Sequence, residues 1–192
     1  MMTSVSSTGT LRDEVVILIG YRGCGKTTVG RRLAERLGWD FLDTDETIQK
    51  DMGRTIHEIF ESDGEAAFRR LEANLLDQAL AGRRRVISAG GGAVLARRNR
   101  KALRAGGLCI WLTAPPEELH RRIIGDERSA SQRPSLAKRP GLAEIEAVLQ
   151  ARLPVYEATA DHVVGTVGRS VDEVVGAILE LLGVGGGGAE DS

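Results

Sequence analysis

The residues with the clearest chemical signature form a glycine-rich segment that ends in a lysine and a threonine. The segment Gly20-Tyr-Arg-Gly-Cys-Gly-Lys-Thr27 matches the pattern GxxxxGK[ST] at every fixed position. It follows an apolar run at residues 15–19 and precedes a segment with helical spacing, which is the context that a phosphate-binding loop requires. Its glycines let backbone N–H groups point inward around phosphate oxygens, and the following helix N-terminus favours negative charge. The sequence therefore predicts a nucleotide phosphate site.

The side chains of this loop have predicted roles in binding ATP and Mg²⁺. We expect Lys26 to reach the β- and γ-phosphates and Thr27 to ligate Mg²⁺. The alternative is a glycine-rich turn that binds nothing, which would leave the lysine and threonine in register by chance. The predicted contacts with ATP in this segment are Gly23, Cys24, Gly25, Lys26, Thr27 and Thr28. Cys24 is either a thiol activated by the loop or a small packing residue.

The loop identifies a superfamily and leaves the reaction open. A switch GTPase would need DxxG and NKxD segments, and neither pattern occurs in the sequence. A motor-type ATPase would need an aspartate at the end of an apolar strand, but residues 86–89 run into glycines instead. Both absences favour a small-molecule kinase.

Two carboxylates, Asp43 and Asp45, follow the apolar segment at residues 39–42. If the strand continues through them, their spacing places both side chains on one face. One carboxylate could then orient Mg²⁺ while the other meets the hydroxyl to be phosphorylated. The alternative is a pair of aspartates that cap the helix beginning near Glu46. Beside a phosphate loop, we favour the functional interpretation.

An arginine and a glycine run are candidates for the second substrate. Arg69 shares a helical face with Glu72, and its planar guanidinium suits a substrate anion. The alternative for Arg69 is a surface salt bridge. Three glycines at residues 90–92 end an expected strand and permit close approach of the backbone to a ligand, or else form a tight turn.

The elements that must position these residues alternate between strands and helices. An apolar, β-branched run predicts a strand at residues 15–19, and further short strands are predicted at residues 39–42, 85–89, 108–112 and 161–167. Helical spacing predicts helices at residues 26–37, 55–60, 65–80, 117–124, 142–151 and 171–182. Such alternation is typical of an α/β fold, a doubly wound parallel five-stranded sheet with helices on both faces. Ligands of such sheets bind beyond the carboxyl ends of the strands.

The sequence predicts one domain over residues 13–182, with a disordered leader at residues 1–12 and a flexible glycine-rich tail at residues 183–192. Residues 125–141 lack periodicity and carry four basic side chains against two acidic ones. A stretch of this length is either a functional lid or plain disorder, and beside a phosphate site we predict a mobile lid.

Composition excludes several classes of function. The sequence has 26 Lys+Arg against 27 Asp+Glu, so nucleic-acid or membrane binding has no support from net charge. The two cysteines have no metal-ligand spacing, which indicates a reducing, cytoplasmic location. No apolar run approaches the roughly 20 residues of a membrane span. We expect a monomer that binds small molecules.

Taken in order, these motifs resemble the shikimate kinase family from about residue 15 to residue 182. The order and spacing of the motifs are more specific than any one of them. They are the phosphate loop, Leu42-Asp-Thr-Asp45, Gly64-Glu65 with Phe68-Arg69 and Glu72, Gly90-Gly-Gly-Ala-Val94, Arg133-Pro134 and Arg152-x-Pro-x-Tyr156.

The resemblance implies how the second substrate is bound. Asp45 matches the position that contacts the ring hydroxyls and is the candidate base. Arg69 and Arg152 match positions that hold the substrate carboxylate, and Gly91 matches a backbone contact.

On the nucleotide side, Asp43 matches the residue associated with Mg²⁺. Arg133 matches a lid arginine that moves over the phosphates, and Arg169 matches a nucleotide-side arginine. The family often carries Val-Asp-Thr where this chain has Val164-Gly-Thr166, so the adenine contacts stay unassigned.

The implied reaction is direct in-line transfer of the γ-phosphoryl of ATP to a shikimate hydroxyl, a step in aromatic amino acid biosynthesis. In this mechanism Lys26, Arg133 and Mg²⁺ offset the transferring charge, and Asp45 orients the hydroxyl. Two alternatives stay open: a kinase for another small acceptor such as gluconate or a nucleoside monophosphate, and a nucleotide-binding regulatory module without turnover.

Overall fold

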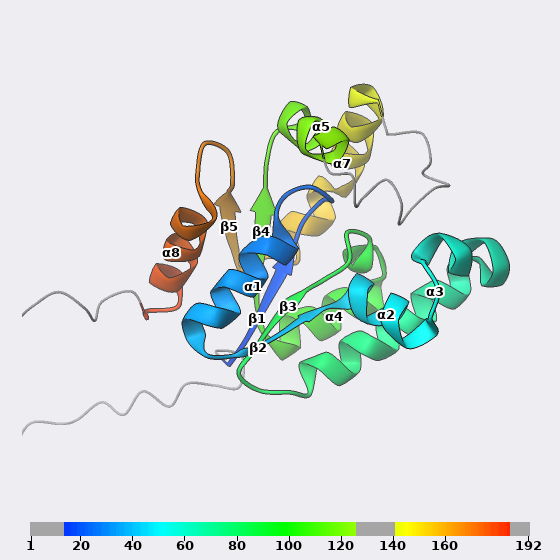
Figure 1. Cartoon of the computed structure of the whole chain (residues 1–192), viewed down its shortest axis with the longest axis horizontal. Helices are drawn as coiled ribbons and strands as arrows, with labels where there is room; N and C mark the ends of the chain where they lie inside the picture. The colour runs from blue at the N-terminus through cyan, green and yellow to red at the C-terminus, as the bar shows by residue number, and fades with distance from the viewer. Residues whose placement is uncertain (1–13, 126–140, 185–192) are drawn as a thin grey trace, which may run out of the picture.

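The computed structural model describes residues 14–125 and 141–184. Its strands are β1 (Val15–Ile19), β2 (Asp40–Asp43), β3 (Arg85–Ser88), β4 (Leu108–Thr113) and β5 (His162–Gly165). They form one sheet in the order β2-β3-β1-β4-β5, and every pair in it is parallel (Figure 1). The prediction of a five-stranded parallel sheet is confirmed.

Helices cover both faces of this sheet. The helices are α1 (Lys26–Leu37), α2 (Thr44–Met52), α3 (Ile56–Leu80), the short 3-10 helix η2 (Ala93–Leu95), α4 (Arg97–Gly106), α5 (Pro116–Gly125), α7 (Leu142–Glu157) and α8 (Val171–Leu181). Helices α1 and α8 pack on one face, while α3 and α4 lie on the other (Figure 1).

The central strand β1 shows why its sequence is apolar throughout. Val16 and Leu18 belong to the core under α1 and α8, whereas Val15, Ile17 and Ile19 belong to the core under α3 and α4. Successive side chains of a strand point to opposite faces, so a strand buried on both faces needs an unbroken apolar run. The loop that leaves β1 is consequently anchored on a rigid base.

Helix α3 combines the two helices predicted around residues 55–60 and 65–80. Thr55 caps its first turn, and the Thr55 and Glu58 side chains form the expected capping box. At Gly64 the backbone leaves the helical region, with φ 81° and ψ 164°, and the helix bends there. The two arms of α3 therefore face a common space from different directions.

Two α-helices, α2 and α4, and the short 3-10 helix η2 were not predicted. Helix α2 begins directly after Asp43, whose side chain accepts hydrogen bonds from the backbone N–H groups of Asp45 and Glu46. The strand therefore ends at Asp43, and the prediction that Asp43 and Asp45 share one strand face is wrong. Helix α4 also escaped prediction because it buries only Asn99 and Leu103.

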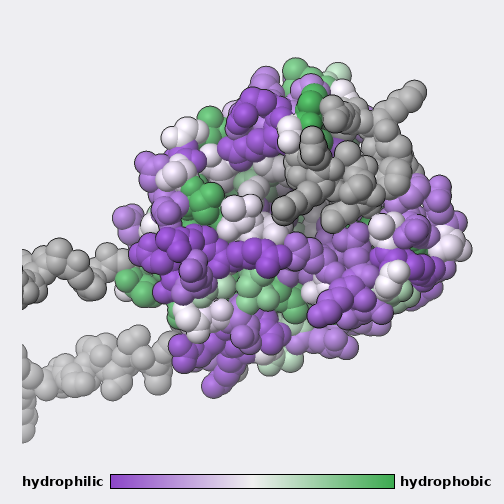
Figure 2. Space-filling view, viewed as in Figure 1, coloured by the Kyte–Doolittle hydropathy of each residue, from purple (hydrophilic) through white to green (hydrophobic). Residues whose placement is uncertain are grey.

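The predicted leader, residues 126–140 of the predicted lid and residues 185–192 of the predicted tail lie outside the described residues. Within the described part, no helix combines the length and the apolar character needed to cross a membrane. Hydrophilic side chains dominate the face of the molecule seen in Figure 2.

Candidate active site

The phosphate loop connects the carboxyl end of β1 to the first turn of α1. Gly20, Gly23 and Gly25 have φ values of 143°, 79° and 97°, which side chains other than glycine rarely adopt. A Cβ atom at Gly20 would also lie 2.3 Å from the carbonyl oxygen of Leu112 on β4. The glycines of the motif are therefore required by the path of the backbone.

The lysine and threonine of the motif are held by defined contacts. Lys26 Nζ donates hydrogen bonds to the carbonyl oxygens of Gly20 at 2.9 Å and Tyr21 at 3.0 Å. Its side chain thus curls over the loop, and the residue is buried. Thr27 Oγ1 donates to Asp43 Oδ2 at 2.8 Å. Two oxygen groups suited to Mg²⁺ consequently meet at the entrance to α1.

A cavity of about 650 Å³ lies against this loop. Every predicted ATP contact within the described residues lines it, while Arg133 lies outside them. The predicted residues on its wall are Gly23, Cys24, Gly25, Lys26, Thr27, Thr28, Asp43, Asp45, Gly91 and Arg169. The cavity extends from the phosphate loop to the turn between β5 and α8, as expected for a nucleotide site.

Cys24 is buried, with 1% of its surface exposed. Its Sγ lies 3.9 Å from Lys26 Nζ and belongs to the apolar core under α1 and α8. This burial favours the packing interpretation of Cys24 over the reactive one.

The two aspartates have different settings. Asp43 Oδ1 caps α2 and Asp43 Oδ2 contacts Thr27, so the capping and metal-side interpretations both describe the same carboxylate. Asp45 stands in the first turn of α2, beside Gly90 at the end of β3. A Cβ atom built on Gly90 would lie 2.5 Å from Asp45 Oδ1. Asp45 lines both the nucleotide cavity and a second, smaller cavity.

This second cavity, of about 310 Å³, lies between the phosphate loop, both arms of α3 and helix α7. The residues predicted to hold the acceptor line it from α2, α3, α7 and the glycine run after β3. The predicted residues that line it are Asp45, Arg69, Gly91 and Arg152. Phe60 and Phe68 supply an apolar wall, with their ring centroids 4.9 Å apart. The cavity therefore combines an apolar wall with polar and charged groups that could bind a hydroxyl and an anion.

Arg69 is oriented by carboxylates on its own helix. Its Nη1 lies 2.9 Å from Glu72 Oε2, and its Nη2 lies 3.3 Å from Glu65 Oε1. The Glu72 side chain is only 1% exposed. Burial on its own lowers the pKa of the Arg69 guanidinium, but Glu72 and Glu65 together outweigh burial and hold the pKa above its usual value. Arg69 and Glu72 thus share a helical face as predicted, and they form a salt bridge on the cavity wall.

Arg152 reaches the same cavity from α7. Its Nη1 donates to the carbonyl oxygen of Gly91 at 3.0 Å, and Tyr156 donates its hydroxyl to the same oxygen at 3.1 Å. The Arg152 guanidinium lies over the Tyr21 ring, 5.8 Å from its centroid. Burial raises the pKa of Tyr156 to about 12, so its hydroxyl keeps the proton it donates.

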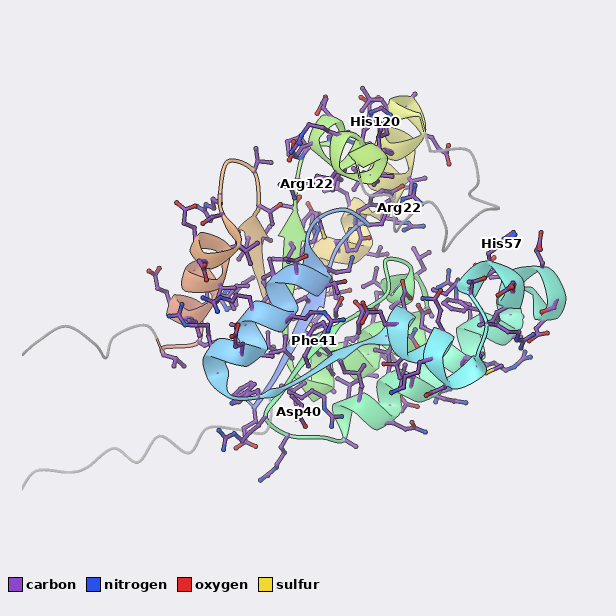
Figure 3. The ribbon with its side chains drawn as sticks, in the orientation of Figure 1. Arg22, Asp40, Phe41, His57, His120 and Arg122 are labelled. Atoms are coloured by element: carbon purple, nitrogen blue, oxygen red, sulfur yellow. The ribbon has the colours of Figure 1, made fainter. Side chains whose placement is uncertain are left out.

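Sequence reasoning missed Arg122 on α5, which also lines the nucleotide cavity (Figure 3). Its Nη1 donates to Thr166 Oγ1 at 2.9 Å, and its Nη2 donates to the Thr166 carbonyl oxygen at 3.0 Å. Its Nε contacts Glu118 at 2.7 Å, and hydrogen bonds from Arg121 and Arg122 lower the pKa of Glu118 to about 2. In sequence, Glu118 and Arg122 look like an ordinary surface pair four residues apart.

Comparison with known sequences identifies a single protein family. A family model described as shikimate kinase matches residues 22–183. The shikimate kinase of Symbiobacterium thermophilum is 46% identical over 167 residues, covering 87% of this chain and 95% of that protein. The shikimate kinase of Oleidesulfovibrio alaskensis is 46% identical over 173 residues, covering 90% of this chain and 99% of that protein.

Solved structures agree with the sequence matches. Shikimate kinase from Acinetobacter baumannii, solved in complex with shikimate, superimposes with a TM-score of 0.81 at 34% identity, covering 88% of this chain and 92% of that one. The Aquifex aeolicus enzyme gives a TM-score of 0.73 at 35% identity, covering 90% of this chain and 99% of that one. A gluconokinase from Sinorhizobium meliloti, with 19% identity and a TM-score of 0.52, shares the fold alone. Because the family model and these relatives cover most of the chain, the chain belongs to the shikimate kinase family.

Proposed function

We propose that this chain catalyses the ATP-dependent phosphorylation of a hydroxyl of shikimate, with Mg²⁺, by direct in-line transfer. The observation that carries this proposal is the position of Asp45, whose carboxylate borders both cavities. One cavity is built around a phosphate loop, and the other is lined by the guanidinium groups of Arg69 and Arg152 and by Arg22. A phosphoryl donor and a carboxylated hydroxyl acceptor can thus meet at a single carboxylate.

The acceptor cavity fits a small carboxylated ring. Arg69 and Arg152 approach it from α3 and α7, and each guanidinium can bind a carboxylate through two N–H groups. Glu72 fixes the orientation of Arg69, and the Gly91 carbonyl fixes that of Arg152. We assign the substrate carboxylate to these two arginines, which leaves the ring hydroxyls for Asp45 and the backbone of Gly91.

The nucleotide side has a donor set that suits Mg²⁺. Thr27 Oγ1 and Asp43 Oδ2 lie 2.8 Å apart, and Mg²⁺ in kinases binds one or two protein oxygens together with phosphates and waters. Among the described residues no group of three or more His, Cys, Asp or Glu side chains could hold a metal ion. When bound, Mg²⁺ neutralises charge on the β- and γ-phosphates.

The chain's own residues then position the reactants. Lys26 leaves the loop carbonyls to contact the β- and γ-phosphates, and the loop N–H groups hold the phosphate oxygens. Asp45 orients the acceptor hydroxyl and accepts its proton as the oxygen attacks the γ-phosphorus. Arg169 contributes on the nucleotide side, as does Arg122. Arg133, outside the described residues, is assigned to a lid over residues 125–141 that excludes water from the transferring phosphoryl.

A coupled assay of ADP release tests this function. We expect release that depends on both shikimate and Mg²⁺, and far slower release with gluconate or a nucleoside monophosphate. The variant Asp45→Asn keeps the size of the side chain but removes its charge, and kcat should fall by about 10²-fold or more. ATP binding with no ADP release in the presence of any of these acceptors would instead support a nucleotide-binding module without turnover.

We further propose that the chain acts as a monomer in the cytoplasm on small molecules alone. Both cysteines, Cys24 and Cys109, are free and buried, which suits a reducing compartment. Size-exclusion chromatography with light scattering at working concentration checks the monomer, and a dimer mass would contradict it.

A further inference from the structure

The two cavities of the site meet along a short boundary. The residues that line both cavities are Arg22, Asp45, Ile56 and Gly91. In the proposed reaction the phosphoryl group crosses this boundary, because its donor occupies one cavity and its acceptor the other. Among residues 14–125 and 141–184, Arg22 is the only cationic side chain on that boundary.

Arg22 lies within the phosphate loop, two residues after Gly20, at a position that the GxxxxGK[ST] pattern leaves open. Its side chain is partly buried, and Figure 3 shows it at the loop that joins β1 to α1. The loop passes close to the glycine run, since a Cβ atom on Gly91 would lie 3.6 Å from the Arg22 backbone nitrogen. Arg22 is thus an addition to the motif at the place where the two substrates meet.

The other described cations of the site each line one cavity only. Lys26, Arg122 and Arg169 line the nucleotide cavity, and Arg69 and Arg152 line the acceptor cavity. Most of these groups also have contacts that fix their direction, such as Arg69 with Glu72. Among the described residues, Arg22 therefore supplies the positive charge at the boundary.

We propose that Arg22 is a further catalytic residue, whose guanidinium binds the oxygens of the γ-phosphoryl group while it passes from ATP to the acceptor. This inference rests on the proposed function. In the step, the bond from the acceptor oxygen to the γ-phosphorus forms as the bond to the β–γ bridging oxygen breaks. The bonding electron pair leaves with ADP, and the hydroxyl proton passes to Asp45.

The chemistry of the step explains why a planar cation would act there. During transfer, negative charge spreads over the three equatorial oxygens of the phosphoryl group and over the two apical oxygens. A guanidinium can donate to two of these oxygens at once, which an ammonium group does less well. A donor that already lines the boundary before the reaction needs little reorganisation, so its effect should appear in the transition state.

The test compares Arg22→Met and Arg22→Lys with the control Arg70→Met, which removes a charge from an exposed position that lines neither cavity. We expect Arg22→Met to lower kcat by about 10²-fold, the usual effect of losing one such donor. The KM values for ATP and shikimate should change by less than about threefold, since the contact belongs to the transition state. Arg22→Lys should recover part of kcat, and Arg70→Met should match the unaltered protein.

A binding measurement separates catalysis from structure. ADP, aluminium fluoride and shikimate together mimic the transferring phosphoryl group, and calorimetry gives their affinity. We expect Arg22→Met to weaken this complex by a factor similar to its loss in kcat, while the affinity for ADP alone stays the same.

Three outcomes would overturn the assignment of Arg22. The first is an unchanged kcat in Arg22→Met, and the second is a higher shikimate KM at normal kcat. The third is an equal loss of activity in Arg22→Lys and Arg22→Met, accompanied by an equal drop in their melting temperatures. The unaltered protein distinguishes this failure from failure of the proposed function. If it shows no shikimate-dependent ADP release, the function is wrong. If it is active and Arg22→Met equals it, only the role of Arg22 is wrong.

Discussion

Replacing Gly90 with alanine would displace the proposed catalytic carboxylate without altering any charged residue. A Cβ atom at this position would lie 2.5 Å from Asp45 Oδ1 and 3.0 Å from Glu72 Oε1. Gly90 has no positive φ, so alanine is compatible with its backbone and the effect is steric. Restoring an ordinary contact requires the Asp45 carboxylate to move by about 1 Å, a misplacement that can cost on the order of 10²-fold in rate.

Steady-state kinetics of Gly90→Ala with both substrates varied would measure this effect. We expect kcat to fall by about 10²-fold with a small change in the KM for ATP, because the phosphate loop is untouched. The matched control is Gly176→Ala on α8, where a Cβ atom meets nothing within 4 Å. This control should keep full activity and gain about 0.5–1 kcal/mol of stability from helix propensity.

A folded Gly90→Ala protein with kcat within about twofold of the unaltered protein would refute the placement of Asp45 at the reacting hydroxyl. Circular dichroism and thermal melting establish that the variant is folded. If kcat stays normal and only the KM for shikimate rises, Asp45 binds the acceptor without taking part in the chemical step.

Three further predictions concern the acceptor arginine, a buried tyrosine and the loop cysteine. Arg69→Lys keeps the charge but loses the planar guanidinium that Glu72 orients. The shikimate KM should therefore rise roughly tenfold or more while the ATP KM stays constant. An unchanged shikimate KM would show that Arg69 does not bind the acceptor. Burial raises the pKa of Tyr156 to about 12, above the usual 10.0, so its contribution to stability is intact below pH 10 and is lost as pH rises toward 12. Urea unfolding at pH 9 and pH 11 should show a loss of about 1.3 kcal/mol that Tyr156→Phe reduces, and equal losses in both proteins would contradict the assignment. Cys24 and Cys109, at 1% and 0% exposure, should react with a thiol reagent slowly and at similar rates in the folded protein, as followed by peptide mapping. Rapid labelling of Cys24 that MgATP prevents would restore the reactive interpretation.

The strands and the phosphate loop could be predicted from sequence because their signals are local. Residues 15–19 are apolar because β1 is buried on both faces, and the loop glycines recur because the backbone needs positive φ values. The edge strand β2 was harder to delimit, since Asp43 both ends the strand and caps α2. The alternating pattern of a strand cannot show whether an aspartate is the last residue of that strand or the N-cap of the next helix.

The parts of the site that escaped prediction depend on contacts between distant segments. Arg122 owes its position to Thr166, which lies 44 residues away and is adjacent only because α5 and the end of β5 meet at one edge of the sheet. Arg22 likewise lines both cavities because the phosphate loop lies beside the glycine run at residues 90–92. Residue types and spacing indicate which groups can bind phosphate, but the boundary between two cavities exists only in three dimensions.

The order of strands in the sheet has a consequence for how this chain acquires its activity during synthesis. Central strand β1 pairs with β3 and β4, so Val16 lies beside Val86 and Leu108, and it has no partner close to it in sequence. Pairings between such distant segments carry a large cost in loop-closure entropy and slow the folding of parallel sheets. The phosphate loop, although near the N-terminus, is steadied by β4, because Gly20 packs against the Leu112 carbonyl. A nascent chain released before β4 has emerged would therefore carry the complete nucleotide motif without the surface that shapes it.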